Sequence, residues 1–120
     1  MDIFKQLEKI STNSLIDCDN TCKKSSALAV TEDGKEIFGV GIMLKAKNFQ
    51  TTAITNAICH AVSEGYIRFK QLYVYVASDN VYDLIMDDET SALLDEFNIY
   101  EFTLFTYSGD MHTQRVEKNT

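Results

Sequence analysis

The side chains best suited to chemistry in this sequence are its three cysteines and two histidines, which are scattered along the chain. Cys18 and Cys22 form a C-x-x-x-C pair, Cys59 and His60 are neighbours, and His112 lies in a polar stretch. A single C-x-x-x-C is a weak metal pattern, and an odd number of cysteines argues against a disulfide framework. Neighbouring residues on a helix do not face each other, so Cys59 and His60 do not form one nucleophilic site. We therefore expect reduced, structural thiols.

An acidic segment, residues 83–89, is the second candidate for chemistry. It supplies four carboxylates, from Asp83, Asp87, Asp88 and Glu89. Such oxygens can bind Mg²⁺ or Ca²⁺, but the spacing differs from the D-x-[DN]-x-[DN]-G loop of calcium sites. Acids just before a helix also stabilise its N-terminal end. Helix capping is the favoured interpretation, and metal binding by this segment stays open.

Hydrophobic spacing predicts the elements that must position these residues. Helices are predicted over residues 2–16, 50–64 and 91–97; Thr51 or Thr52 can cap the second helix, and Gly65 ends it. Strands are predicted over residues 27–30, 36–44, 72–77 and 100–107, and a turn at Asp33 and Gly34 joins the first two in a hairpin. Residues 81–86 are predicted as a short strand or a loop.

The predicted order of elements is therefore α-β-β-α-β-α-β. Helices that alternate with strands predict an α/β fold, here a three-layer α/β/α sandwich around a mixed sheet. The length of 120 residues favours a single domain over residues 1–120. The polar composition from Ser108 onward predicts a loose tail over roughly residues 108–120.

The chain resembles the small cytidine deaminases over roughly residues 25–106. The resemblance is carried by TEDGK at 31–35, Gly39, AICHAVSEG at 57–65, YIRF at 66–69, ASD at 77–79 and LDEF at 94–97. The predicted order of elements is also that of the cytidine-deaminase fold. In that family a zinc ion, held by Cys or His and by two further Cys, activates a water, and a Glu transfers protons to the base.

The positions that would carry this chemistry hold other residues here. Counted from the family's pattern, the zinc-ligand positions fall on Thr52, Asp87 and Thr90, and the position of the Glu falls on Ile54. Zinc in such a site takes thiolate or imidazole ligands, and an isoleucine cannot transfer a proton. No cysteine follows Cys59, so the family's P-C-x-x-C motif is absent from the sequence.

The positions that would hold the nucleoside are changed as well. The Asn and Glu that hold the ribose in the family correspond to Gly41 and Met43, and the aromatic residue that packs on the base corresponds to Lys23. The resemblance thus implies a degenerate member with no metal and no cofactor. Its pocket positions, which could bind a ligand, are Lys23, Gly41, Met43, Thr52, Ile54, Asp87 and Thr90.

Composition limits the partners of the chain. A net charge of −7 and a pI of about 4.7 disfavour binding to nucleic-acid phosphates or to anionic membrane surfaces. The sequence has neither a secretory leader nor an apolar membrane-spanning stretch, so we expect a cytoplasmic protein. The resemblance implies a homo-oligomer, a dimer or a tetramer, with an active paralogue as another candidate partner.

Three functions follow from these observations. The first is a catalytically inactive cytidine-deaminase-like protein, a pseudoenzyme, that serves as a binding or oligomeric assembly module. The second is a zinc-free protein that binds a nucleoside-like small molecule in the remodelled pocket. The third, an active deaminase with altered metal ligands, is disfavoured because an oxygen-rich ligand set suits a harder metal than zinc.

Overall fold

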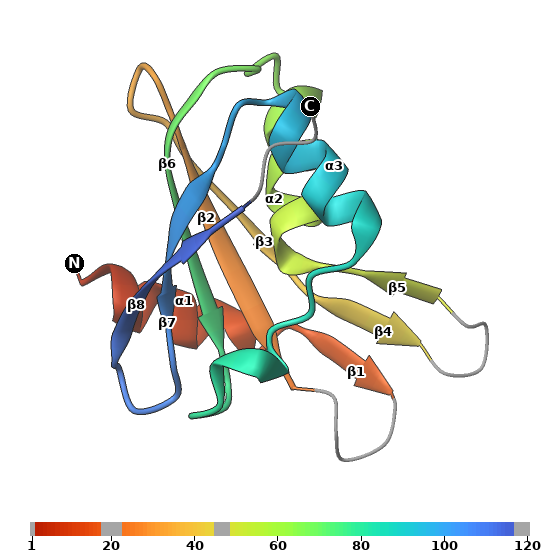
Figure 1. The fold of residues 1–120 in the computed structure, drawn as a ribbon, viewed down its shortest axis with the longest axis vertical. Coiled ribbons are helices and arrows are strands. Elements are labelled where there is room, and N and C mark those ends of the chain that lie inside the picture. The colour runs from red at the N-terminus through yellow and green to blue at the C-terminus, as the bar shows by residue number, and fades with distance from the viewer. Residues whose placement is uncertain (1, 18–22, 45–48, 117–120) are drawn as a thin grey trace.

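A five-stranded mixed sheet forms the middle of the computed structural model, which describes residues 2–17, 23–44 and 49–116 (Figure 1). Its strand order is β3-β2-β6-β7-β8. The strands are β2 (Ser25–Thr31), β3 (Glu36–Val40), β6 (Phe69–Val76), β7 (Glu101–Phe105) and β8 (Met111–Arg115). β6 and β7 run parallel, whereas the other neighbours are antiparallel. The predicted hairpin is present: β2 and β3 pair across a turn in which Gly34 has a φ of 89°.

Helices cover both faces of this sheet. On one face, α1 (Ile3–Ser11) buries Leu7 against Leu28, Tyr75 and Phe105. On the other face, α2 (Ala53–Ser63) and α3 (Asp88–Glu96) bury a larger apolar cluster that includes Ile54 and Leu94. The structure thus confirms the predicted three-layer α/β/α sandwich.

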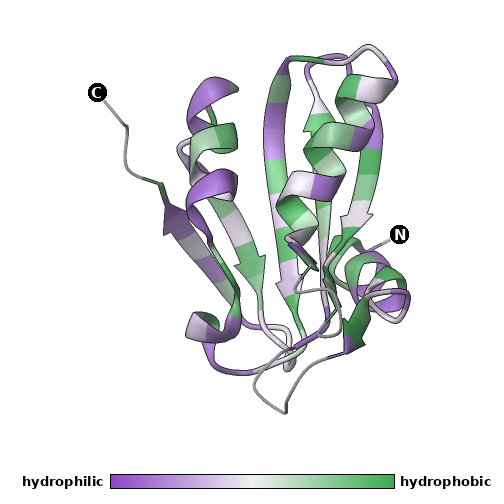
Figure 2. Ribbon diagram, turned by 90° about the vertical axis from the view of Figure 1, so that its right-hand side faces the viewer, coloured by the Kyte–Doolittle hydropathy of each residue, from purple (hydrophilic) through white to green (hydrophobic). Residues whose placement is uncertain are grey.

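Strand β6 is the central strand that the apolar run LYVYVA predicts. Leu72, Val74 and Val76 belong to the cluster under α2 and α3, whereas Tyr75 belongs to the cluster under α1. Alternation of side chains along a strand explains this division, because successive residues point to opposite faces. Figure 2 shows the contrast with the edge strand β8, which is coloured as hydrophilic.

The first helix is shorter than predicted. It ends at Ser11, not at residue 16, and residues Leu15–Asp17 form a strand, β1. The cause lies in the polar run after Ile10: the Ser11 and Thr12 hydroxyls donate to backbone carbonyls three residues earlier. Such side chains compete with the helical backbone for hydrogen bonds and favour its termination.

The strand predicted over residues 36–44 is broken at Gly41. β3 stays in the large sheet, whereas β4 (Ile42–Leu44) joins β1 and β5 (Phe49–Thr51) in a second sheet of order β1-β4-β5. Gly41 donates its N–H to Ser25 O, and a Cβ there would lie 2.5 Å from Ser25 Oγ. The chain can change sheets here because the residue has no side chain.

The predicted tail and the predicted starts of the second and third helices need correction. The loose tail from Ser108 is wrong for Met111–Arg115, which form β8 through antiparallel pairing with β7. Residues 117–120 lie outside the described residues. α2 begins at Ala53 because Thr52 caps it, and α3 begins at Asp88, three residues earlier than predicted. For residues 81–86, predicted as a short strand or a loop, the loop alternative is confirmed: the segment contains one 3-10 turn, Val81–Asp83, and no strand.

Gly39 explains how closely the second helix lies on the sheet. A Cβ at this position would lie 2.3 Å from Ala57 N and 2.8 Å from Ala53 O, both in the backbone of α2. A residue without a side chain therefore allows strand β3 and helix α2 to touch through their backbones.

In the described part of the chain, no helix is long and apolar enough to cross a membrane.

Candidate functional site

Three of the predicted positions meet where the N-terminal ends of α2 and α3 face each other. Thr52 is the N-cap of α2, and its Oγ1 accepts from Thr55 N at 3.2 Å. Asp87 is the N-cap of α3, and its Oδ1 accepts from Thr90 N at 2.8 Å. The two helices are joined by a hydrogen bond of 2.7 Å between Thr52 Oγ1 and Thr90 Oγ1. We call Thr52, Thr55, Asp87 and Thr90 the hydroxyl cluster.

The direction of the hydrogen bonds in the hydroxyl cluster follows from proton counting. A threonine hydroxyl carries one proton. Thr90 Oγ1 donates to Asp87 Oδ1 at 2.6 Å, so Thr90 must accept from Thr52. Thr55 Oγ1 lies 3.2 Å from Thr90 Oγ1 and can donate to the same oxygen. Thr52 Oγ1 and Thr55 Oγ1 also lie 3.1 Å apart. The cluster thus directs the Thr90 proton to the Asp87 carboxylate, a negative charge that the two helix N-termini also favour electrostatically.

This cluster does not fit a zinc ion. Thr90 is fully buried and Thr52 is 5% exposed, and their oxygens are already engaged with each other and with Asp87. Only one of the three positions offers a carboxylate, and none offers the thiolate or imidazole that zinc requires. Within residues 2–17, 23–44 and 49–116, no three His, Cys, Asp or Glu side chains lie close enough to hold a metal ion.

Four predicted positions line one small pocket beside the hydroxyl cluster. They are Lys23, Met43, Thr52 and Ile54, joined by Ser25, Ala53, Asp83, Leu84 and Ile85. Its volume is about 10 Å³, which is room for roughly one water molecule. Side chains fill the remainder: Ile54 is 1% exposed and belongs to the core, and Met43 is also buried.

The remaining predicted positions lie next to this pocket without lining it. Gly41 is buried against Ser25, and its carbonyl accepts from Ser14 Oγ at 2.6 Å. Asp87 and Thr90 lie in the hydroxyl cluster. Sequence reasoning missed Thr55 and Ser25. A T-x-x-T spacing from the cap, Thr52 to Thr55, is the signal that could have identified the first.

Among the other candidates for chemistry, His60, Asp83 and Asp87 have structural partners. His60 lies on the exposed side of α2, with Nδ1 3.3 Å from Phe38 O and Nε2 3.6 Å from Glu64 Oε2. Cys59 is exposed, and Cys18 and Cys22 lie outside the described residues. In the acidic segment, Asp87 caps α3 as the capping interpretation expects, and Asp83 accepts from Ser78 Oγ.

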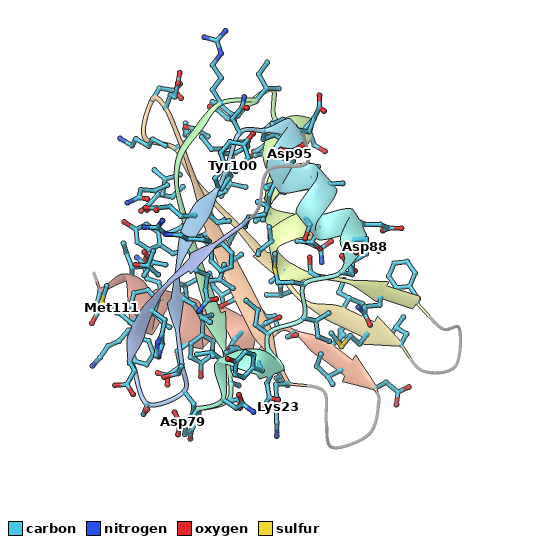
Figure 3. The ribbon with its side chains drawn as sticks, in the orientation of Figure 1. Lys23, Asp79, Asp88, Asp95, Tyr100 and Met111 are labelled. Carbon is cyan, nitrogen blue, oxygen red and sulfur yellow. The ribbon has the colours of Figure 1, made fainter. Side chains whose placement is uncertain are left out.

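One carboxylate outside the predicted set has a shifted pKa. Asp79 lies at the lower end of the molecule in Figure 3. Its Oδ1 accepts from Ser108 Oγ at 2.7 Å and from Ser108 N at 2.9 Å. These two bonds, the side-chain bond first, lower the pKa of Asp79 because they stabilise its charged form.

Comparisons of the sequence with protein-family models and with curated proteins find no match. Solved structures do match. The cytidine deaminase of Burkholderia pseudomallei superposes with a TM-score of 0.77 at 16% identity, over 95% of this chain and 90% of that chain. The enzyme of Mycobacterium leprae gives 0.62 at 19% identity, over 94% of each chain. That of Mycobacterium tuberculosis gives 0.65 at 14%, over 97% and 92%. The chain therefore has a cytidine-deaminase-like fold.

Proposed function

We propose that this chain is a catalytically inactive cytidine-deaminase-like protein, a pseudoenzyme, that works as a binding or oligomeric assembly module in the cytoplasm. The observation that carries the proposal is the hydroxyl cluster. The resemblance puts the zinc ligands at Thr52, Asp87 and Thr90, and there a satisfied hydrogen-bond network joins α2 to α3. The position of the proton-transferring Glu holds Ile54, which packs in the core.

The size of the pocket supports a role other than nucleoside binding. Pockets for small molecules usually have volumes of about 300–1,000 Å³, whereas this one holds about 10 Å³. Met43 and Ile54 occupy the space instead, and both are buried. A zinc-free nucleoside-binding protein would require these side chains to move, so it is the less supported alternative.

Exposed apolar side chains on the second sheet support the assembly role. β1 and β5 are the edges of the β1-β4-β5 sheet, and Leu15 on β1 and Phe49 on β5 are 59% and 48% exposed. Edge strands with exposed apolar residues are ready to pair with another chain. A second copy, in a homo-dimer or tetramer, is the proposed partner; an active paralogue is the other candidate.

Two measurements test the proposal. Elemental mass spectrometry of tag-free protein should find no stoichiometric zinc, and the same preparation should not turn over cytidine. About one zinc per chain together with cytidine turnover would overturn the assignment as a pseudoenzyme. Light scattering should give the mass of a dimer or tetramer; a single peak at the monomer mass would overturn the assembly role alone.

A further inference from the structure

A second hollow lies at the end of the molecule away from the hydroxyl cluster. We call it the distal groove; its volume is about 560 Å³, and its walls include Glu32, Ile67, Arg68, Phe69, Glu96 and Phe97. Three turns form it: β2 to β3, α2 to β6, and α3 to β7. The first two lie together at the top of Figure 1, and Asp95 and Tyr100 mark the same end in Figure 3, opposite Lys23.

The walls of the distal groove combine charged side chains with three apolar ones, Ile67, Phe69 and Phe97. Phe69 and Phe97 pack edge to face, with ring centroids 5.7 Å apart and an interplanar angle of 80°. Ile67 is 61% exposed beside them. Arg68 O accepts from Glu32 N at 3.0 Å, which fixes the β2–β3 turn against the start of β6. A volume in the usual range for ligand pockets, with two phenyl rings among charged side chains, suits a molecule that has both an apolar part and a charged group.

The charged side chains of the groove are available to a ligand. The carboxylates of Glu32 and Glu96 and the guanidinium of Arg68 make no hydrogen bond or ion pair with any described residue. Two carboxylates against one guanidinium leave an excess of one negative charge. The whole chain, at −7, adds to this field. A cation is therefore attracted to the groove more than an anion is.

Helix dipoles act in the same direction. α3 ends at Glu96, and α2 ends at Ser63, just before the turn at Gly65 that adjoins the groove. The C-terminal end of a helix carries roughly half a negative charge and favours cations within the last turn. The N-terminal ends of the same two helices meet at the hydroxyl cluster, so the two sites have opposite electrostatic character.

We propose that the distal groove binds an amphipathic amine, a molecule with an ammonium group on a flat apolar body. The apolar body lies against Phe69, Phe97 and Ile67, and the ammonium lies between the carboxylates of Glu32 and Glu96. Contact of a cation with an aromatic face adds to this attraction. The site is independent of the proposed loss of deaminase activity, because it uses none of the residues of the hydroxyl cluster.

Three matched probes test the charge preference: phenethylamine, phenethyl alcohol and hydrocinnamate, which share one ring and differ in charge. Each is titrated into the full chain at low salt while heteronuclear NMR follows the amide shifts. We expect phenethylamine to shift the amides of Ile67, Phe69 and Phe97, to bind roughly fivefold more tightly than the alcohol, and to weaken with added salt. Hydrocinnamate should bind least.

Charge variants give the matched controls. Glu32→Gln with Glu96→Gln should remove the preference for the amine, whereas Glu89→Gln, an exposed glutamate at the other end of α3, should leave it unchanged. Arg68→Gln should tighten amine binding because it removes the repelling charge. The proposal fails if no probe shifts the groove amides, if hydrocinnamate binds best, or if Arg68→Gln weakens the amine. The same spectra show whether each variant is folded.

Discussion

Thr52 Oγ1 and Thr90 Oγ1 lie 2.7 Å apart, and this contact joins two helices through residues that are 38 positions apart in the chain. Thr90 Oγ1 donates a hydrogen bond to Asp87, so at this contact it accepts from Thr52. By the resemblance to the zinc-dependent deaminases, these helix ends correspond to the place where those enzymes hold their metal ion. Hydrogen bonds connect the same two helix ends in this chain.

Thr90→Val should destabilise the protein by about 1–3 kcal/mol, because it keeps the volume and removes the buried hydroxyl that donates to Asp87 and accepts from Thr52. Urea unfolding followed by circular dichroism measures the loss. Thr113→Val, on the exposed strand β8, is the matched control and should change little. Equal stability of the Thr90 variant and the control would show that the cluster contributes nothing.

Asp87→Ala removes the N-cap of α3 and the acceptor of Thr90, and should cost about 1–2 kcal/mol. Asp88 lies next to Asp87, is exposed, and accepts no hydrogen bond in the described part of the chain. The variant Asp88→Ala is therefore the comparison. Thermal unfolding should give a lower Tm for the Asp87 variant than for the Asp88 variant. The reverse order would contradict the capping role.

Gly39→Ala should destabilise more than Gly41→Ala. A Cβ at Gly39 meets backbone atoms of α2 at 2.3 Å and 2.7 Å, which can move only if the helix moves. A Cβ at Gly41 meets Ser25 Oγ, the end of a side chain that can rotate. Overpacking of a core costs about 1–3 kcal/mol and sometimes more. Denaturant unfolding of both variants checks the order, and a larger loss at Gly41 would be inconsistent with this contact.

The bonds from Ser108 to Asp79 predict one component of the pH dependence of stability. The pKa of Asp79 is lower in the folded chain than its ordinary value of 3.8. The folded state therefore gains stability above the unfolded pKa, and loses it as pH falls through the lower folded pKa. Asp79→Asn should flatten the fall in unfolding free energy between neutral and strongly acid pH. An unchanged acid limb would argue against these bonds.

Charge placed at the edges of the second sheet should prevent assembly. Leu15→Lys and Phe49→Lys put a cation on strands β1 and β5, and charged residues on edge strands block pairing with another chain. Light scattering should show a smaller mass for these variants than for the parent. Tyr107→Lys, at an exposed position away from this sheet, is the control and should keep the parent's mass.

The sequence predicted the layers well because they depend on local patterns. The apolar, β-rich run at residues 72–77 favoured a central strand, and Gly65 marked the end of α2. The second sheet was missed because β1 pairs with β4, far along the chain, and a three-residue strand has little periodicity to detect. β8 was missed for a related reason: its polar residues gain their order from pairing with β7.

The candidate site, like the fold, was predictable from the sequence only in part. The resemblance assigned Thr52, Asp87 and Thr90 to one place, and the structure brings these three together; a ligand-binding role for them stays a prediction. The volume of the pocket depends on how Met43 and Ile54 pack against residues from other segments, which no local pattern records. The distal groove was not predicted, because each of its three turns supplies only a few of its residues.

The hydroxyl cluster has a consequence for the rate at which the protein unfolds. Its two caps come together only after the segment between them, which includes the whole of β6, has folded. The chain must lose loop-closure entropy before this non-local contact can form, so we expect it to form after the folding transition state. A late contact slows unfolding and barely changes the folding rate. We therefore expect Thr90→Val to raise the unfolding rate in a chevron plot, while the folding limb remains where it was.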